Sequence, residues 1–411
     1  MFRKVVIPLG GMGTRLYPLT VDTSKAMVRV LNRPLIELML TKMASQGLTE
    51  FYMGLSGYTN YVSVYDYLGG GGRIAARLGI PPDLIRVRYQ PNVESVGSAD
   101  SVKTIMDYYG FDEPFLVVQG DLIFDLDVFH MWQHHQASKS FMTIALKELE
   151  PDEDISRFGV AEVGEGNVLR GFVEKPSGMN PPSRQVNTGI YLFSQGLRDF
   201  FESPEGMKLQ QERRMDFGKD VIPSLVSQGY RIVGFPLKGF WFDLGTPEGY
   251  LKAVFSLLRR LDANELGITG KFEGVRFQGR SDKSAQLQKQ LIDRAQRGAY
   301  KFTGDILLGR HIALEPEVEI DSSVIDNYTI LQKGSSVSNS VIMDRCLIGK
   351  GTIIKRSIVG RHTIIGQKCV IEDSVIGNNV SVGDNSALNK AKIWPAKKIN
   401  PATKLLDTSV S

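Results

Sequence analysis

Aliphatic residues recur at every sixth position in the last part of the chain, as in SIVGRHTIIGQKCVIEDSVIGNNVSVGDNS, often followed by a glycine or a small polar residue. The recurring positions are Ile306, Ile312, Val318, Val324, Ile330, Ile358, Ile364, Val370, Ile376, Val382 and Leu388. An α-helix, with about 3.6 residues per turn, cannot keep such a period on one face. A three-sided parallel β-coil uses about six residues per side and points one of them inward. The period therefore predicts a parallel β-helix whose core these residues form.

The phase of this period slips by one residue in two places. One slip lies between Ile353 and Ile358 and the other between Val370 and Ile376, and we interpret both as irregular turns. A stacked coil buries its core only over several turns and leaves open ends. We therefore expect the coil to associate with other subunits, so that the protein is a homo-oligomer, or to dock against the preceding domain.

The chain before residue 262 has a different pattern. Short apolar runs such as KVVIPL and FLVVQGD alternate with amphipathic stretches such as SADSVKTIMDYYG. Strands bounded by glycine and aspartate and separated by helical spacing are typical of βαβ units. The pattern predicts an α/β domain with a Rossmann-like, mixed but mainly parallel sheet, in which binding sites lie at the carboxyl ends of strands.

The 411 residues are too many for one comfortable core, and changes of pattern divide them into segments. We expect the α/β domain over residues 1–262 and a linker with a polar helix over 263–303. The β-helix is expected over 304–394 and a C-terminal tail over 395–411.

Composition argues against several classes of protein. The formal net charge is +4 and the basic residues are scattered, so the charge indicates neither a nucleic acid nor a membrane as partner. No apolar run of about 18 residues and no secretory leader pattern occurs, and we expect a cytoplasmic protein. The two cysteines, Cys346 and Cys369, have no CxxC spacing, and we interpret them as reduced thiols that fill space.

The stretch PLGGMGTRLYPLT places three glycines within four residues shortly before an arginine. Gly10, Gly11 and Gly13 would let the backbone approach a ligand closely and turn several N–H groups towards one anion. The stretch matches neither a Walker A sequence nor a GxGxxG fingerprint, and a tight turn is the alternative interpretation. Arg15 and Lys25 follow and would supply cations for phosphate oxygens. The loop therefore predicts a phosphate site, with a triphosphate as its ligand.

Two aspartates stand at the ends of apolar segments. Asp121 ends FLVVQGD and Asp243 ends GFWFD. Two carboxylates delivered in this way would hold one Mg²⁺ on the phosphates, whereas a turn or cap after a strand is the alternative role. Asp125 and Asp127 lie beyond the strand end and are expected to be turn and cap residues.

Eight motifs, in this order, resemble those of the sugar-1-phosphate nucleotidyltransferases, which are also called nucleotide-sugar pyrophosphorylases. The motifs are GGMGTRLYPLT, SKAMVRVLNRPLIE, FLVVQGD, FGV, FVEKPS, VNTGIYLF, DFGKDVIP and FWFDLGTPEGYL. The resemblance covers essentially the whole chain, because many members carry a C-terminal left-handed β-helix. It implies a catalytic domain over 1–262 and Mg²⁺-dependent transfer of a nucleotidyl group from an NTP to a hexose-1-phosphate, giving an NDP-sugar and pyrophosphate.

The resemblance also implies roles for the residues that match the motifs around the phosphates. Arg15 would stabilise the leaving phosphates, and Lys25 would contact the phosphates at the reacting centre. Asp121 and Asp243 would bind Mg²⁺. The nucleotide site would consist of Leu9, Gly10, Gly11, Gly13, Thr14, Gln90 and Gly97.

A second group of matching residues would hold the sugar phosphate. Lys175 would bind its phosphate, Glu174 and Asn187 would bond to the sugar hydroxyls, and the Gly159 backbone would border the sugar. The segment FWFDLGTPEGYLKA and the attached coil are most similar to branches of the family that act on glucose-1-phosphate or mannose-1-phosphate.

Some positions depart from the usual pattern of the family. Pro8 and Leu9 stand where members commonly have Leu-Ala beside the base, and Ser24 precedes the lysine where proline is frequent. Gln90 lies seven residues before Gly97, which is more than in pyrimidine-specific relatives. An amide can both donate and accept, so Gln90 would pair with the imide edge of uracil or thymine. We therefore place UTP or dTTP ahead of GTP.

Two other functions stay open. A six-residue β-helix can also form an acyltransferase site, which would make the enzyme bifunctional with His362 of GRHTIIG as the base. Alternatively, a catalytically silent member of the fold would act as a regulatory or assembly protein. Such members typically lose the loop arginine, the lysine or the metal carboxylates, all of which are present here.

Overall fold

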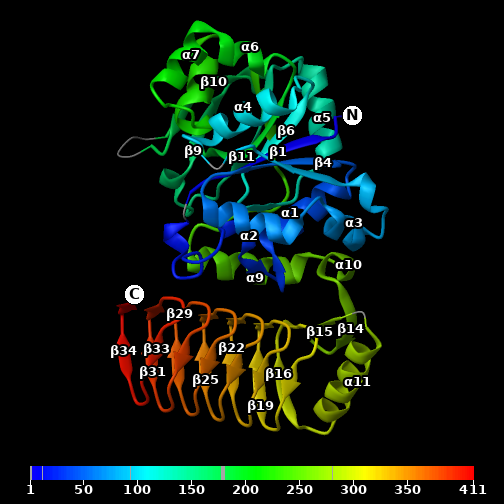
Figure 1. The fold of residues 1–411 in the computed structure, drawn as a ribbon, viewed down its shortest axis with the longest axis vertical. Coiled ribbons are helices and arrows are strands. Elements are labelled where there is room, and N and C mark those ends of the chain that lie inside the picture. The colour runs from blue at the N-terminus through cyan, green and yellow to red at the C-terminus, as the bar shows by residue number, and fades with distance from the viewer. Residues whose placement is uncertain (1, 12, 93, 177–180, 280) are drawn as a thin grey trace. The chain divides into compact units, whose positions relative to one another are not determined.

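The computed structural model describes residues 2–11, 13–92, 94–176, 181–279 and 281–411 (Figure 1). They form two compact units. Unit 1 consists of Met1–Gly11 and Leu35–Asp243, and unit 2 consists of Met12–Pro34 and Leu244–Ser411. The division at Leu244 precedes the predicted boundary at residue 262. The early segment 12–34 belongs with the C-terminal part, which the sequence pattern did not indicate.

Unit 1 is built on a mixed sheet with the strand order β10-β9-β11-β6-β1-β4-β5, to which β8 and β12 are added. Its strands are β1 (Lys4–Leu9), β4 (Glu50–Leu55), β5 (Arg86–Tyr89), β6 (Phe115–Val118), β8 (Met142–Glu148), β9 (Gly159–Val163), β10 (Leu169–Glu174), β11 (Gln185–Phe193) and β12 (Ile232–Pro236). β1 pairs in parallel with β4 and β6, whereas β11 runs antiparallel to β6, β8 and β9. Two short strands, β7 (Leu122–Phe124) and β13 (Trp241–Asp243), form an antiparallel pair. The predicted α/β fold is confirmed, with more antiparallel pairing than the sequence pattern indicated.

Helices cover the sheet of unit 1 through apolar faces. They are α1 (Leu35–Ala44), α2 (Tyr58–Leu68), α3 (Gly72–Leu78), α4 (Ser98–Tyr109), α5 (Val128–Ser138), α6 (Leu197–Glu202), α7 (Pro204–Gln211) and α8 (Ile222–Ser227). In α4, Val102, Ile105 and Met106 recur at helical spacing and share one core with Phe115 and Val117 of β6. Burying each such side chain contributes about 1.5–3 kcal/mol, which orients the helix on the sheet. None of the helices in the described ranges is long and apolar enough to cross a membrane.

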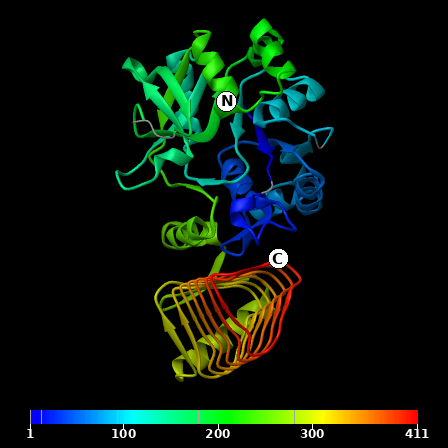
Figure 2. The same ribbon diagram turned by 90° about the vertical axis from the view of Figure 1, so that its left-hand side faces the viewer.

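Unit 2 contains three sheets that wind into a left-handed β-helix, whose turns stack on one another in Figure 2. The first sheet is β14 (Ile268–Phe272), β15 (Val275–Gln278), β17 (Ile306–Leu308), β20 (Val324–Ile325), β23 (Val341–Ile342), β26 (Ile358–Val359), β29 (Val375–Ile376), β32 (Lys392–Ile393) and β35 (Ser409–Val410). The second is β16 (Tyr300–Thr303), β19 (Val318–Asp321), β22 (Ser336–Ser338), β25 (Ile353–Lys355), β28 (Val370–Glu372), β31 (Ala387–Asn389) and β34 (Lys404–Leu406). The third is β18 (Ala313–Leu314), β21 (Ile330–Leu331), β24 (Leu347–Ile348), β27 (Ile364–Ile365), β30 (Ser381–Val382) and β33 (Lys398–Ile399). Unit 2 also contains α9 (Pro247–Arg260), α10 (Ala263–Leu266), α11 (Asp282–Gln296) and the strand pair β2 (Arg29–Val30) and β3 (Arg33–Pro34).

From β17 on, successive turns of the coil are separated by 17 residues, one fewer than three full sides of six, whereas β16 and β19 are 18 residues apart. Leu307 pairs with Val324, which pairs with Val341 one turn later. The hydrogen bond from the Ser340 N–H to the Ser323 hydroxyl likewise spans 17 positions. A strict six-residue period therefore drifts by one residue per turn, and this drift accounts for the phase slips in the sequence.

The drift makes five of the predicted core positions wrong. Val324, Ile330, Ile358, Ile364 and Val370 lie outside the coil core, and the aliphatic residue after each occupies it instead. These replacements are Ile325, Leu331, Val359, Ile365 and Ile371. The other predicted positions, Ile306, Ile312, Val318, Ile376, Val382 and Leu388, do lie in the core. Because the affected strands carry two adjacent aliphatic residues, and side chains alternate between the faces of a strand, the period alone could not decide which residue points inward.

The predicted tail over 395–411 is wrong as well. This segment carries β33, β34 and β35, which pair in register with the preceding turn and so extend the coil. The polar helix expected in the linker is present as α11, and its Leu291 joins the coil core. The coil therefore begins inside the segment that was predicted to be a linker.

Buried hydroxyl and thiol groups stack at the inner corners of the coil. The N–H groups of Ser357 and Ser374 each donate to the serine hydroxyl one turn earlier, both at 3.0 Å. Cys346 and Cys369 occupy equivalent positions in threonine stacks, and the Cys369 N–H donates to Thr352 Oγ1 at 3.0 Å. Both thiols are free and buried, so their interpretation as space-filling side chains is confirmed.

Burial of the thiols leads to a testable prediction. Burial raises the pKa of the Cys346 thiol to about 12 and also raises the pKa of Cys369. Because only the thiolate reacts readily, neither cysteine of the native protein should react with a disulfide reagent at pH 8 within minutes. Both should react once guanidinium has unfolded the chain, which serves as the internal control. Rapid reaction of a native thiol at this pH would contradict the packing described above.

Candidate active site

A cavity of about 320 Å³ lies at the carboxyl ends of β1, β4 and β6 in unit 1. It is lined by Pro8, Gly10, Gly11, Gly54, Ser56, Ser95, Val96, Gly97, Ser98, Ser101, Gln119 and Asp216. The carboxyl ends of parallel strands are the usual place for a ligand in an α/β sheet. Among the described residues of this lining, only Asp216 is charged, so most polar groups that they offer to a ligand are backbone amides and hydroxyls.

The start of the glycine loop forms one wall of this cavity. Gly10 and Gly11 are exposed and line it, and Gly11 adopts a φ of +88°, a conformation that side-chain-bearing residues rarely take. Leu9 is only 6% exposed and packs against Gly120, where an added Cβ would lie 2.1 Å from a Leu9 methyl carbon. Gly10 and Gly11 are thus open to a ligand of this cavity, whereas Leu9 supports the wall from behind.

The N-terminus of α4 forms the opposite wall. A Cβ at Gly97 would lie 2.2 Å from the Met215 carbonyl oxygen, so a glycine is required for the two backbones to approach. The Ala99 N–H donates to the same oxygen at 2.9 Å, and the Ser98 hydroxyl donates to Asp216 at 3.2 Å. The N-terminal end of a helix carries partial positive charge, so this wall suits an anionic ligand.

Gln90 does not face the cavity as its predicted role requires. It is 3% exposed, and its amide nitrogen donates to the carbonyl oxygens of Leu55 at 2.9 Å and Asn92 at 2.6 Å. Its amide oxygen accepts from the Ser101 hydroxyl at 2.6 Å. Both amide hydrogens are therefore used inside the protein, and no donor is left for a base. Gln90 instead holds the loop before α4, and the reason for ranking pyrimidine nucleotides first is lost.

Asp121 and Asp243 lie close together in the strand pairing of unit 1. In the antiparallel pair of β7 and β13, Asp243 is the register partner of Leu122, the residue directly after Asp121. Both aspartates are partly buried. Two carboxylates suit Mg²⁺, which commonly binds one or two carboxylates together with substrate phosphates and water. In the described part of the chain no group of three or more His, Cys, Asp or Glu side chains could hold a metal ion.

Glu174 occupies a space that two glycines leave open. A Cβ at Gly159, its register partner in β9, or at Gly218 would lie 2.6 Å from a Glu174 carboxylate oxygen. Burial raises the pKa of Glu174, and the nearby Asp216 raises it further, although the Lys175 ammonium at 3.4 Å opposes both. Three separated motifs therefore meet at one carboxylate.

Asn187 lies at an irregular point of β11, where the pairing with β8 is interrupted. Its amide nitrogen donates to the Tyr191 hydroxyl at 2.9 Å, and its amide oxygen accepts from the Gly189 N–H at 2.8 Å. The Tyr191 hydroxyl also bonds to the side chain of Gln119, which lines the cavity. The predicted sugar residues Glu174 and Asn187 are therefore linked to the cavity through its lining residues Asp216 and Gln119.

Asp216 is a site residue that the sequence reasoning missed. Its carboxylate lines the cavity, accepts from Ser98 and caps the short helix over Phe217–Val221 by accepting from the Lys219 N–H at 3.1 Å. Asp216 belongs to the motif DFGKDVIP, which was used only to identify the family resemblance and not to assign a site residue. An aspartate before a Phe-Gly pair in an otherwise apolar motif was the available signal.

The remaining predicted residues belong to unit 2. Gly13, with a φ of +60°, precedes the short helix Thr14–Leu16, in which Thr14 and Arg15 are exposed. The next short helix begins at Lys25, and the buried Ser24 side chain caps it. Serine thus has a local reason to precede the lysine, because its hydroxyl accepts from a helix N–H as a cap.

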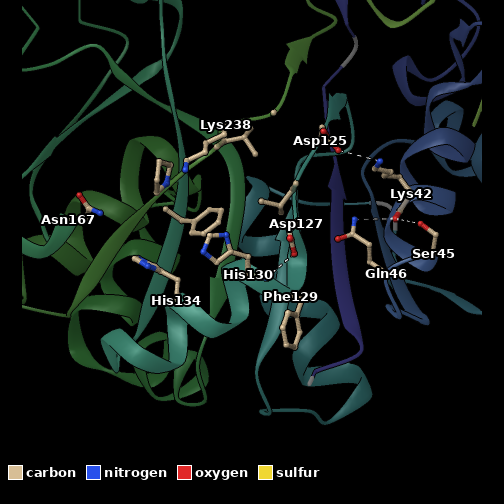
Figure 3. Close-up of a pocket in the computed structure, with 15 residues that line it drawn as sticks. Lys42, Ser45, Gln46, Asp125, Asp127, Phe129, His130, His134, Asn167 and Lys238 are labelled. Atoms are coloured by element: carbon tan, nitrogen blue, oxygen red, sulfur yellow. Dashed lines mark hydrogen bonds and ion pairs between the residues drawn. The ribbon is translucent and has the colours of Figure 1, made fainter. Parts of the chain in front are cut away.

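A second cavity of unit 1, of about 720 Å³, contains none of the predicted site residues (Figure 3). Asp125 forms an ion pair there with Lys42 at 3.3 Å, and Asp127 caps α5 by accepting from the His130 N–H at 2.9 Å. The predicted turn and cap roles of these aspartates are thus confirmed for Asp127, while Asp125 pairs with a lysine. Because none of the residues of the family motifs lines this cavity, we do not take it as the candidate active site.

Comparison with protein families gives two matches. The model described as Nucleotidyl transferase matches residues 4–260, and the model described as GMPPB C-terminal domain matches residues 302–406. Among curated proteins, the UTP–glucose-1-phosphate uridylyltransferase of Synechocystis sp. is 26% identical over 349 residues, which is 81% of this chain and 85% of that protein. The glucose-1-phosphate adenylyltransferase of Clostridium novyi is 29% identical over 276 residues, which is 63% of this chain and 68% of that protein.

A solved structure resembles the fold. The UDP-glucose pyrophosphorylase from Acinetobacter baumanii superposes with a TM-score of 0.52 at 20% sequence identity, covering 72% of this chain and 100% of that one. At this identity the likeness concerns the fold alone.

The buried carboxylate of Glu174 leads to a prediction on stability. The pKa of Glu174 is raised in the folded protein, so ionisation of this carboxyl destabilises the fold. The protonated carboxyl contributes its full stability below the pKa of the unfolded chain. This contribution is lost as the pH rises through the pKa of the folded protein. Glu174→Gln should therefore increase the free energy of unfolding at pH 8 and change it little near pH 4, as measured by denaturant titration. Glu162→Gln, an exposed control in β9, should change the free energy of unfolding by the same amount at both pH values. An equal or lower stability of Glu174→Gln at pH 8 would contradict the effect of burial.

Proposed function

Because the chain belongs to the nucleotidyl transferase family, we propose that it transfers a nucleotidyl group from an NTP to a hexose-1-phosphate and releases pyrophosphate. The observation that supports this most is the meeting of three features at one edge of the sheet. They are the glycine wall at Gly10 and Gly11, the α4 N-terminus at Gly97 and the adjacent pair Asp121 and Asp243. An anionic, metal-bound nucleotide fits such a combination.

In the proposed reaction, an oxygen of the sugar phosphate forms a bond to the α-phosphorus of the NTP while the bond to the pyrophosphate oxygen breaks. The transfer joins anionic groups, so positioning and charge neutralisation matter more than proton transfer. Asp121 and Asp243 would hold Mg²⁺, which would neutralise phosphate charge when bound. Arg15 and Lys25 take the roles that their motif implies, on the leaving phosphates and at the reacting centre.

The sugar is assigned to the other end of the site. Glu174 would accept from sugar hydroxyls, Asn187 would orient the sugar, the Gly159 backbone would border it, and Lys175 would bind its phosphate. The partial burial of Glu174 strengthens a hydrogen bond to a neutral hydroxyl, because little water competes. Glucose-1-phosphate is the first sugar to test, since the two named relatives act on it, and mannose-1-phosphate is the second. The base stays open, because those relatives transfer a uridylyl and an adenylyl group.

No observation among the described residues favours the two other functions. His362 is exposed at a corner of the coil, where its backbone N–H donates to the Asp344 carbonyl oxygen at 3.0 Å. Arg15, Lys25, Asp121 and Asp243 argue for a catalytic rather than a silent protein.

The function is tested by pyrophosphate release with Mg²⁺ across four ribonucleoside triphosphates and dTTP, each with glucose-, mannose-, galactose- and N-acetylglucosamine-1-phosphate. One pair should exceed the others in kcat/KM. Release that does not depend on a sugar phosphate would contradict the proposed transfer.

The proposed metal role predicts the effect of Asp121→Asn. Loss of one carboxylate ligand should reduce kcat at least about 100-fold while the protein stays folded, because metal-assisted charge stabilisation is worth several kcal/mol. Asp243→Asn should act in the same direction. Asp83→Asn, which removes an exposed carboxylate of unit 1, should change kcat less than twofold. Full activity of Asp121→Asn in the presence of Mg²⁺ would exclude the assigned role.

The oligomer is proposed to form through the third sheet of the coil. Ile330 and Ile364 stand in register on its outer face and are 40% and 50% exposed, so water contacts apolar surface there. The double variant Ile330→Asp with Ile364→Asp should have the mass of a monomer in light scattering, unlike the wild type. Ser336→Asp, on the outer face of the second sheet, is the control and should leave the mass unchanged. A wild-type monomer, or a double variant that still assembles, would contradict this assembly surface.

A further inference from the structure

The segment 12–34 belongs to the same compact unit as the β-helix. It carries Arg15 and Lys25, and its regular structure is limited to two short 3-10 helices and the strand pair β2–β3. A segment with so little regular structure moves easily unless other contacts hold it. Several contacts of this segment are made with the coil, and one is made with α9.

The strongest contact is an ion pair at the first sheet of the coil. The Arg29 guanidinium forms two hydrogen bonds with the carboxylate of Asp326, which follows β20 and is 1% exposed. Arg29 also lies 3.7 Å from the Asp344 carboxylate one coil turn further. Asp344 in turn accepts from Arg361 at 2.5 Å and 3.2 Å. Arg29 is therefore held by carboxylates of two successive turns.

Further hydrogen bonds at Arg29 itself and at Asn32 hold this part of the segment. The Asn32 amide donates to Gln278 at 2.9 Å and to the Ile325 carbonyl oxygen at 3.4 Å. The Tyr250 hydroxyl of α9 donates to the Arg29 carbonyl oxygen at 2.5 Å. The second half of the segment is thus tied to the coil and to α9 through backbone as well as side-chain groups.

The first half of the segment reaches later turns of the coil. Asp22 accepts from the Asn378 amide at 3.1 Å, and the Tyr17 ring contacts Trp394 edge to face with centroids 6.1 Å apart. Asp344, Arg361 and Asn378 follow one another at the 17-residue interval, so they form a single row along the coil. Along the chain, Tyr17 and Asp22 lie between Arg15 and Lys25, and the anchored Arg29 follows Lys25.

We propose that this row, together with Asp326 and Trp394, is a positioning site for catalysis that holds the segment bearing Arg15 and Lys25. The proposal rests on the proposed function, in which these two residues neutralise the phosphates. Transfer depends on placing such groups accurately, and an error of about 1 Å can cost 100-fold in rate. The coil thereby acts on the reaction as well as on assembly. A buried ion pair suits this task, because its geometry is specific even where its net contribution to stability is small.

The test compares Arg29→Met with Arg356→Met. Arg356 forms a similar two-point pair with Asp373 one turn later, but in a different row of the coil that makes no contact with residues 12–34 among those described. Hydrogen exchange of the amides of residues 14–28 should be at least tenfold faster in Arg29→Met and unchanged in Arg356→Met. In Arg29→Met, kcat should also fall at least tenfold, while KM for the sugar phosphate changes less than twofold. Arg29→Lys should lie in between, because lysine restores the charge but not the two-point geometry.

If Arg29→Met does not fold, Trp394→Leu replaces it, since this change removes only the contact with the partly exposed Tyr17. Exchange rates equal to those of the control would overturn the anchoring, and faster exchange with unchanged kcat would overturn the positioning role. Hydrogen exchange can be measured without turnover. The positioning role and the proposed nucleotidyl transfer can therefore be rejected independently of each other. If the wild type processes no substrate pair, the proposed function fails, and the positioning role is then decided by exchange and by NTP affinity, which Arg29→Met should reduce.

Discussion

The cavity of unit 1 depends on backbone lying where side chains would normally stand. Gly97 lets the α4 N-terminus meet the backbone at Met215, and Gly120 lets the strand end before Asp121 pass under Leu9. Gly159 and Gly218 leave the volume that the Glu174 carboxylate fills. At Gly97 a methyl group would meet backbone, so the distance between these two walls is set by hard contact, whereas at the other three glycines it would displace the side chain of Leu9 or Glu174. Polar groups placed on such walls lose little entropy when a ligand binds, which is the advantage of a preformed site.

The class of fold could be predicted from the sequence, because the period of apolar residues follows from geometry that needs no knowledge of contacts. The register of the coil could not be predicted from the sequence. Its turns of 17 residues leave one side short, and paired aliphatic residues such as Val324 and Ile325 satisfy either phase. The strands after residue 395 were missed for a related reason, since Lys398 and Lys404 stand where earlier turns have apolar residues. Near the open end fewer neighbours remain to be covered, so the pattern weakens although the backbone pairing continues.

The site shows a similar division. Asp121 and Asp243 could be chosen as candidate residues because each follows a buried apolar segment, where a carboxylate is placed at the strand end. Antiparallel pairing of β7 and β13 then brings the two residues together. Gln90 was misassigned because its amide bonds to Leu55, Asn92 and Ser101 depend on loop paths that no local pattern encodes. Asp216 was overlooked for the opposite reason, since its importance comes from meeting Ser98 and approaching Glu174, both remote in sequence. The closeness of Asp121 and Asp243 follows from one strand pair, whereas the contacts of Gln90 and Asp216 come from several converging elements.

The constant length of the coil turns gives the β-helix a use beyond stacking. Because the turns from β17 on each add 17 residues, groups at the same corner stay in line, and Asp344, Arg361 and Asn378 form one row. An irregular segment such as 12–34 can then be held at several turns without regular structure of its own. The sheets of the coil differ accordingly. Outward residues of the first sheet, such as Val324 and Ile358, are fully buried, whereas Ile330 and Ile364 of the third sheet are exposed. A repeat that is uniform in its backbone therefore carries different surfaces on its sides, which allows one scaffold to hold a catalytic segment along one edge and offer an assembly surface on another face.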